Sequence, residues 1–317
     1  MNNLVLILLV ILYGCSSIQR GVLRASSPLF LGISNDLTRE RNWEFFREAA
    51  PGDLKFLEVL YLQDKQNLGL LTTVIKGYAG YTYAVSETLA FGDEIAGVES
   101  SIHKQNAIVL YTKSLDYGLE YLRLKGIQKK ELLDLDEAGL TKLLSDKLSR
   151  KDLTAVLFFA QSWGSLINLQ KDNVALVAHV PKVKTIFDWI CSKDAQIENG
   201  VCDIFYAQYE AARPRMLGGN PEKARELYKV AINKRPKHLL MRLGFIQYCL
   251  LPAYDKEAYE KESIILREEL AKWENLNRDN LEDTSEYKAV EQLNLFNAIA
   301  KKRFELIEKN KLKIFEG

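Results

Sequence analysis

The chain has 317 residues, of which 47% are hydrophobic, and its 43 basic residues nearly balance 42 acidic ones. This balance lacks the basic excess of a nucleic-acid-binding protein, so we expect no nucleic acid among its partners. The length allows one large domain or two ordinary ones, and a helical array often exceeds the usual domain size as a single unit.

The N-terminus has the pattern of a secretory signal. Leu4 to Leu12 is an unbroken apolar run, too short for the roughly 20 residues that span a bilayer but suited to the h-region of a signal peptide. Gly14 then precedes Cys15, as in a bacterial lipobox, although no Lys or Arg stands before the run. The alternative is a buried N-terminal helix with an incidental cysteine.

We therefore expect residues 1–14 to be a lipoprotein signal peptide and 15–34 to be a lipid-anchored tether. Cys15 would carry acyl chains such as palmitate, and several chains on one cysteine make a stable membrane anchor. Ser16 after it, rather than an aspartate, favours the outer membrane, with the protein facing the periplasm.

Three cysteines remain: Cys191, Cys202 and Cys249. An odd number in an exported protein implies at least one free or intermolecular thiol. Cys191 and Cys202 stand near the end of one predicted helix and the start of the next, so they could form a disulfide. Two buried, reduced cysteines are the alternative.

Residues 35–317 read as a single helical domain, because helical periodicity recurs in nearly every window and strand alternation is sparse. We expect a helix to end at Ala49 and a second to run from Leu54 to Asp64, with Pro51 and its neighbours breaking the chain between them. A longer helix should follow from Leu68 to about Ala90. Its glycines Gly77 and Gly80 need a packing reason, because glycine costs roughly 1 kcal/mol against alanine inside a helix. We expect both to let a neighbouring helix come close.

Further helices are expected over 104–125, 155–169, 174–192, 202–217, 238–251, 256–276 and 286–312. Lys129 to Arg150 reads as a charged insertion between repeats. The lysines of the last helix read as a solvated face.

The most regular stretch is Gly218 to Pro236. Asn220 can cap a helix, Pro221 suits its first position, and Pro236 ends it. Its apolar residues recur at helical spacing, and the offsets of Ala224, Tyr228, Ala231 and Pro236 match the second helix of a tetratricopeptide (TPR) repeat. An ordinary amphipathic helix shares the apolar spacing.

The same small–aromatic–small offsets recur at Ala107, Tyr111 and Ser114, and loosely at 183, 187 and 190. Matches that begin at 107, 183 and 224 do not keep a 34-residue period. The fold class predicted is therefore all-α, an antiparallel helical-hairpin bundle with divergent TPR-like repeats.

Motifs for catalysis and metal binding are missing. The histidines His103, His179 and His238 have no ligand partners at metal-binding spacing, and no nucleophile elbow or phosphate loop occurs. Gly218-Gly219 precedes a helix and could hold an anion, but ending one helix and starting another explains it more simply. We expect no enzyme, no metal and no cofactor.

Helical arrays recognise ligands through concave or enclosed surfaces, where aromatic side chains carry much of the contact. The ligand-binding candidates are Tyr78, Tyr81, Phe159, Trp163 and Trp189. The alternative for each is a place in the core.

With these residues in view, the chain resembles the TPR lipoproteins associated with tripartite ATP-independent periplasmic (TRAP) transporters. The similarity is sharpest over 217–225, and it is also carried by Trp163-Gly164 with Ile167 and Asp172, by the tyrosine-rich 78–83 stretch, and by 110–119. It implies an acylated periplasmic helical protein that pairs with the solute-binding subunit of the transporter. It further implies a homotrimer with a hydrophobic channel through each protomer, and a role in handling small hydrophobic or organic-anion ligands.

The sequence thus supports two hypotheses. The first is a lipid-anchored accessory protein of a TRAP-type transporter, which binds the solute-binding subunit and a small ligand in a helical cavity. The second is a TPR scaffold lipoprotein for envelope protein assembly. An apolar tunnel would favour the first hypothesis, and an open polar groove the second.

Overall fold

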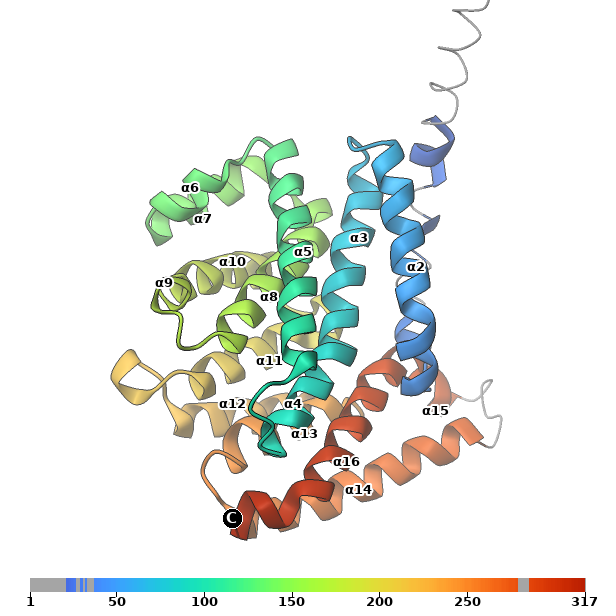
Figure 1. Ribbon diagram of the computed structural model, residues 1–317, viewed down its shortest axis with the longest axis vertical. Coiled ribbons are helices and arrows are strands. Elements are labelled where there is room, and N and C mark those ends of the chain that lie inside the picture. The colour runs from blue at the N-terminus through green and yellow to red at the C-terminus, as the bar shows by residue number, and fades with distance from the viewer. Residues whose placement is uncertain (1–20, 27–28, 31, 33–36, 279–284, 317) are drawn as a thin grey trace, which may run out of the picture.

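The computed structural model describes residues 21–26, 29–30, 32, 37–278 and 285–316 (Figure 1). Within these ranges every regular element is a helix, which confirms the all-α class. The expected signal peptide, Cys15 and much of the tether lie outside the described residues.

The elements are, in chain order, η1 (Leu37–Arg39), α2 (Trp43–Gln63), α3 (Leu68–Tyr81), η2 (Thr82–Glu87), α4 (Thr88–Ile95), α5 (Ile102–Leu124), α6 (Lys129–Asp134), α7 (Glu137–Lys147), η3 (Arg150–Asp152), α8 (Leu153–Leu169), α9 (Val174–Val177), α10 (Val180–Lys193), α11 (Ile197–Ala212), η4 (Arg215–Leu217), α12 (Pro221–Lys234), α13 (Leu239–Phe245), η5 (Ile246–Leu250), α14 (Lys256–Arg278), α15 (Ser285–Lys288), η6 (Glu291–Leu293) and α16 (Asn294–Glu316). Of the short elements, η2 and η5 are π-helices that continue α3 and α13, and the other four are 3₁₀ turns.

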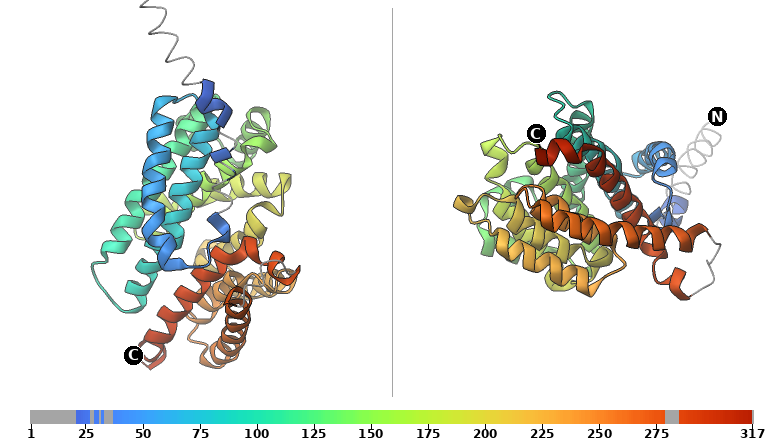
Figure 2. Two further views of the ribbon diagram at one scale, coloured as in Figure 1. Left: turned by 90° about the vertical axis from the view of Figure 1, so that its right-hand side faces the viewer. Right: turned by 90° about the horizontal axis from the view of Figure 1, so that it is seen from below.

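Successive helices pack on one another through most of the chain. In the upper part of Figure 1, α2, α3 and α5 stand side by side and α8 and α10 follow. The lower part holds α12, α13, α14 and α16, and α14 and α16 run beneath the upright helices (Figure 2). In the middle, α11 packs against α12 and also contacts α10.

The helix expected within 218–236 forms as predicted. Asn220 caps α12, with its side-chain oxygen accepting a hydrogen bond from the Lys223 amide at 3.0 Å, and Pro221 occupies the first position. The helix ends at Lys234, two residues before Pro236. The Gly218-Gly219 pair joins η4 to this helix, and an added Cβ on Gly219 would lie 1.8 Å from the carbonyl oxygen of Arg213. Glycine is thus required there by the close approach of the backbone.

The predicted break at Pro51 is wrong, because α2 continues through it as one helix. Proline inside a helix removes one backbone hydrogen bond and normally kinks or breaks the helix. Pro51, Gly52 and Asp53 are all exposed, so water can reach the carbonyl group that has lost its donor. Apolar side chains on the opposite side of α2, such as Phe46 and Leu54, hold both halves against the protein.

Several helix boundaries also differ from those expected. The helix expected over 202–217 ends at Ala212, before Pro214, because the residue before a proline avoids the helical conformation. The last long helix begins at Asn294 instead of 286, after the short α15 and η6. The insertion over 129–150 contains α6 and α7, and α7 packs on α10.

The small–aromatic–small residues are core residues. Ala107, Tyr111 and Ser114 are fully buried, and the Ser114 hydroxyl donates to the Ile75 carbonyl oxygen at 3.1 Å and accepts from the Ser162 hydroxyl at 2.9 Å. Small residues at this crossing let α5 approach α3 and α8. Ala224, Tyr228 and Ala231 on α12 are likewise fully buried. Their assignment to TPR-like repeats stays a prediction.

The two glycines of α3 differ. A Cβ on Gly77 would lie 2.5 Å from Leu54 Cδ2, so this glycine lets α2 come close, as expected. A Cβ on Gly80 would meet nothing within 4 Å, so the packing reason expected for it is wrong. Gly80 lines a cavity between the helices.

The buried apolar residues form two main cores. The upper core contains residues of α3, α5, α8 and α10 together with the end of α2, for example Leu71, Leu157 and Ile186. The lower core contains residues of α12, α13, α14 and α16 together with the start of α2, for example Trp43, Tyr228 and Leu266. The cavity lies between them, and its lining includes side chains from both.

Candidate functional site

A cavity of about 470 Å³ separates the two cores. This volume falls within the range of about 300–1,000 Å³ that is typical of small-molecule sites. Most of its wall is aliphatic or aromatic. The apolar side chains include Leu37, Phe46, Leu54, Leu57, Leu157, Phe158, Ile167, Val177, Val180, Val183, Phe187, Val201, Ile204, Phe205, Leu240, Leu295, Phe296 and Ile299.

One wall of the cavity is a face of α11. Val201, Ile204, Phe205 and Gln208 follow one another at helical spacing and all line the cavity, so each is only partly buried although α11 lies within the protein. Phe205 stacks flat on Phe187 of α10, with ring centroids 3.7 Å apart. The stack connects this wall to the upper core.

A left-handed turn begins α11. Glu198, Asn199 and Gly200 have φ angles of 45°, 57° and 89°, which non-glycine residues rarely adopt. Glycine suits the third position, because its φ of 89° is one that residues with a side chain rarely adopt. Strained backbone of this kind is concentrated at functional sites. Here it directs Glu198 to the cavity wall.

Glu198 forms an ion pair with Lys76 of α3 on the cavity wall. The Lys76 Nζ to Glu198 Oε1 distance is 2.8 Å, and the two side chains are 8% and 18% exposed. The same ammonium group lies 5.5 Å from the centre of the Phe158 ring. The pair joins α3 to α11 across the boundary of the cavity, and each charge compensates the other.

A disulfide between Cys191 of α10 and Cys202 of α11 closes the loop that contains the left-handed turn. This settles the alternative that the sequence left open, and Cys249 is a buried free thiol. The bridge holds the ends of the segment that presents Glu198.

Replacing both Cys191 and Cys202 by serine should lower the free energy of unfolding by about 2–3 kcal/mol, the loop-closure entropy for a short loop. Urea denaturation of the wild type, with and without reductant, should show the same loss on reduction. The double serine variant should not respond to reductant, and a reductant response of equal size in that variant would contradict the assignment.

A second charged group reaches the cavity where the two π-helices approach each other. Glu87, from η2, lines the cavity and accepts a hydrogen bond of 2.5 Å from the Tyr111 hydroxyl. Arg303 of α16, 1% exposed, lies 3.7 Å from the Glu87 carboxylate and donates to the Tyr83 carbonyl oxygen at 3.0 Å. It also donates to Gln247 of η5 at 3.3 Å.

Arg303 thus connects the two π-helices, which are rare elements that often mark functional sites. Burial alone would lower the pKa of Arg303, but the acidic groups of Tyr83 and Glu87 outweigh it, so the pKa is raised and the charge is held.

His238, before α13, is a further polar residue of the wall. The residue is 2% exposed, it lines the cavity, and neither ring nitrogen has a hydrogen-bond partner within the described structure. Its ring lies 5.0 Å from that of Phe296. Burial, assisted by the nearby Arg235 charge, lowers the pKa of His238 to about 4, so the imidazole is neutral at pH 7.

This shift predicts acid-sensitive stability. Between about pH 6.5 and pH 4 the unfolded chain protonates His238 and the folded protein does not, so the unfolded state binds more protons. The free energy of unfolding should therefore fall as the pH drops through this window, by about 3 kcal/mol from this residue. Urea denaturation as a function of pH should show a shallower decline for His238→Leu, and identical slopes for both proteins would contradict the prediction.

Of the five aromatic residues expected to bind ligand, Tyr81 lines the cavity and packs against both cores. Phe159, Trp163 and Trp189 are at most 6% exposed and do not line it. Phe159 occupies the space over Gly118, Trp163 packs on it, and the Trp189 indole donates to the Ser145 hydroxyl at 3.2 Å. The structure therefore places these three in the packed upper core.

Tyr78 also lies away from the cavity and takes part in a polar cluster. Its hydroxyl and that of Tyr117 donate to Glu58 at 3.1 and 2.5 Å, and Lys55 and Lys113 pair with the same carboxylate. Burial would raise the pKa of Glu58, but these donors outweigh it and lower the pKa to about 2. The ionised Glu58 carboxylate and its donors thus join α2, α3 and α5.

Sequence reasoning missed Lys76, Glu198, His238 and Arg303. A signal existed for Lys76, which is a lone charge within the apolar stretch from Leu68 to Val85. Glu198 directly precedes Asn199-Gly200, a dipeptide typical of turns. His238 and Arg303 lie in stretches with many charges and give no such signal.

Within the described ranges, no cluster of His, Cys, Asp and Glu side chains is arranged to hold a metal ion. Among the same residues, no helix combines the length and the apolar character needed to cross a membrane.

Comparison with known proteins places the chain in a family. A family model described as TRAP transporter T-component matches residues 39–315, nearly the whole chain. No curated protein matches the sequence significantly. The chain therefore belongs to the T-component family, whose members are accessory components of TRAP transporters.

Proposed function

We propose that this protein is a lipid-anchored, periplasm-facing accessory subunit that binds a small, largely apolar molecule in the cavity between its two cores. We further propose that it exchanges this molecule with the solute-binding subunit of the transporter. The observation that carries the proposal is the largely apolar cavity of about 470 Å³ between the two cores. An interior packed only for stability would fill such a space, because voids much larger than a water molecule are rare.

The size of the cavity limits the ligand. At about 30 Å³ for each water-sized group, it holds roughly fifteen non-hydrogen atoms. A mostly apolar cavity of this size supports the binding of a small molecule over the alternative of a TPR scaffold, which needs a groove that admits a protein segment.

The disulfide supports an exported protein, because disulfides persist mainly in oxidising compartments such as the periplasm. The Cys15 anchor would hold the protein at the membrane, and mass spectrometry of the mature N-terminus tests it. An acylated Cys15 is expected, and an unmodified Met1 would reject the anchor.

The partnership is tested by pull-down of the tagged protein, at native expression, against the periplasmic solute-binding protein of the same cell. We expect the solute-binding protein to co-purify in a defined ratio. Its absence from the pull-down would count against the exchange function, while the cavity itself is tested by the ligand experiments below.

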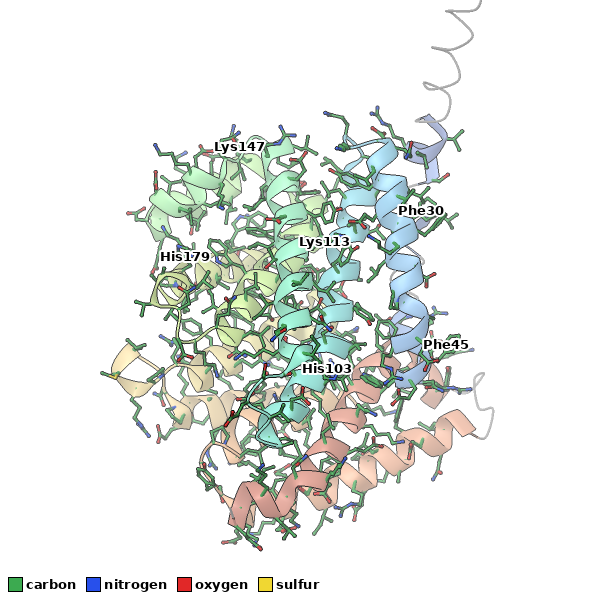
Figure 3. All side chains as sticks on the ribbon, viewed as in Figure 1. Phe30, Phe45, His103, Lys113, Lys147 and His179 are labelled. Carbon is green, nitrogen blue, oxygen red and sulfur yellow. A yellow bond between two sulfur atoms is a disulfide. The ribbon has the colours of Figure 1, made fainter. Side chains whose placement is uncertain are left out.

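The expected homotrimer remains a proposal, supported by an apolar stripe on the outer face of α2. Phe45, Phe56 and Val59 fall on one side of this helix and are 60%, 59% and 53% exposed (Figure 3 labels Phe45). Sedimentation of the wild type and of Phe56→Glu tests whether this stripe joins copies of the chain. A trimer in the first and a monomer in the second are expected.

A further inference from the structure

The charges of the cavity wall are compensated before any ligand enters. Lys76 and Glu198 pair with each other at 2.8 Å. Arg213 stacks 3.6 Å above the Tyr209 ring and pairs with Glu210 at 3.3 Å. Glu87 faces the Arg303 guanidinium. The other charged lining residues, Asp53 and Lys171, are exposed to solvent.

A carboxylate ligand would therefore enter an apolar space in which each buried cation already has an anionic partner. Moving an isolated ionised carboxylate into such a space is very unfavourable. Displacing Glu198 from Lys76 to make room would leave the Glu198 charge without its partner. The wall thus disfavours an organic anion.

His238 favours a ligand that carries a hydrogen-bonding group. A neutral imidazole has one N–H donor and one acceptor nitrogen. Both are buried at the cavity wall without a partner in the described structure, and an unsatisfied buried polar group costs about 1–3 kcal/mol. Because both nitrogens are fully buried, the imidazole must turn toward the cavity to reach a ligand. A ligand that offers a hydrogen-bonding group at this point then gains what a pure hydrocarbon cannot.

We propose that the ligand is an uncharged, largely apolar molecule that carries a hydroxyl or carbonyl group, and that His238 forms the hydrogen bond that recognises this group. This inference rests on the proposed ligand-binding function of the cavity. A hydroxyl both donates and accepts, so it fits either tautomer of the imidazole; a carbonyl oxygen accepts from the N–H.

The test uses three probes of one chain length: octanol, octanoate and octane, titrated against the purified protein at pH 7.5. The readout is the rise in Tm with probe concentration, which yields a Kd for each probe. We expect octanol to bind roughly fivefold or more tightly than either of the others. A fivefold difference in Kd corresponds to the net free energy that one hydrogen bond contributes.

His238→Leu should remove the preference for octanol over octane. The ligand-free variant should be as stable as the wild type or more stable, because its two unpartnered nitrogens are gone. His238→Gln, which keeps an uncharged donor and acceptor, should retain part of the preference. His103→Leu, on α5 and outside the lining (Figure 3), is the matched control and should behave as the wild type.

The outcomes separate this inference from the function on which it rests. Tighter binding of octanoate than of octanol, or an octanol preference that survives in His238→Leu, would overturn the inference while leaving the cavity as a binding site. If no probe raises the Tm, the proposed ligand-binding function itself fails. Octanol selectivity that depends on His238 supports both.

Discussion

Replacing Arg303 by methionine should lower the free energy of unfolding by about 3–5 kcal/mol, the loss expected when one partner of a buried ion pair is removed. Methionine fills most of the arginine volume, so the loss reports the charge and its hydrogen bonds. Glu87 would keep a buried negative charge without its counter-ion, and the Tyr83 carbonyl and Thr88 hydroxyl would lose donors at 3.0 and 2.8 Å. Urea denaturation by circular dichroism measures the change.

A double-mutant cycle identifies the cause. Glu87→Gln alone should also destabilise the protein, and the double variant should lose about 1–3 kcal/mol less than the sum of the single changes, because the two side chains interact. The matched control on the same helix is Lys301→Met. Lys301 pairs with Glu274 at 2.6 Å but is 41% exposed, so this change should stay within about 1 kcal/mol. Strict additivity of the two buried changes would show that Arg303 does not stabilise Glu87.

This network explains how the fold accommodates the π-helix η2. In a π-helix the ordinary backbone hydrogen bonds are displaced, and the freed groups need other partners. The Tyr83 carbonyl oxygen receives Arg303, and the Ala84 carbonyl oxygen receives the Trp43 indole N–H at 2.7 Å. Arg303 and Trp43 come from segments far apart in the sequence. Their convergence on η2 joins the first and last helices of the lower core.

The helices could be predicted from the sequence because their signals are local. Asn220, Pro221 and the apolar spacing that follows define α12 without any tertiary information. Pro51 shows the limit of local rules. Whether a helix breaks at a proline depends on the solvation of the freed carbonyl and on the packing of the opposite face, and both are set by the rest of the fold.

The cavity could not be predicted in the same way. Phe205 and Phe159 are similar in local sequence context, since each lies on an apolar helix face, but one borders the cavity and the other packs over Gly118. The difference arises from how far the neighbouring helices stand apart. That spacing depends on contacts between segments more than 100 residues apart, such as the Lys76–Glu198 pair with a separation of 122. Periodicity reports that a face is apolar, but not whether a cavity or a side chain meets it.

Filling the cavity from Gly80 should abolish most ligand binding without unfolding the protein. Gly80→Phe places a side chain in the space where a Cβ meets nothing within 4 Å. A benzyl group occupies roughly 200 Å³ at about 30 Å³ for each non-hydrogen atom, which is a large part of the 470 Å³ cavity. We therefore expect octanol affinity to fall by at least about tenfold, equal to about 1.4 kcal/mol. The stability should change little, because the helix loses a flexible glycine while the ring fills an existing void.

The matched control is Gly52→Phe on α2. Gly52 is likewise a helical glycine with nothing within 4 Å of its Cβ, but it is exposed to solvent and lies outside the lining. Because both variants add the same ring to a helix, a loss of affinity confined to Gly80→Phe locates the ligand in the cavity between the cores. If Gly80→Phe keeps a native circular dichroism spectrum and binds octanol as the wild type does, the ligand binds elsewhere, and the function proposed for the cavity is wrong.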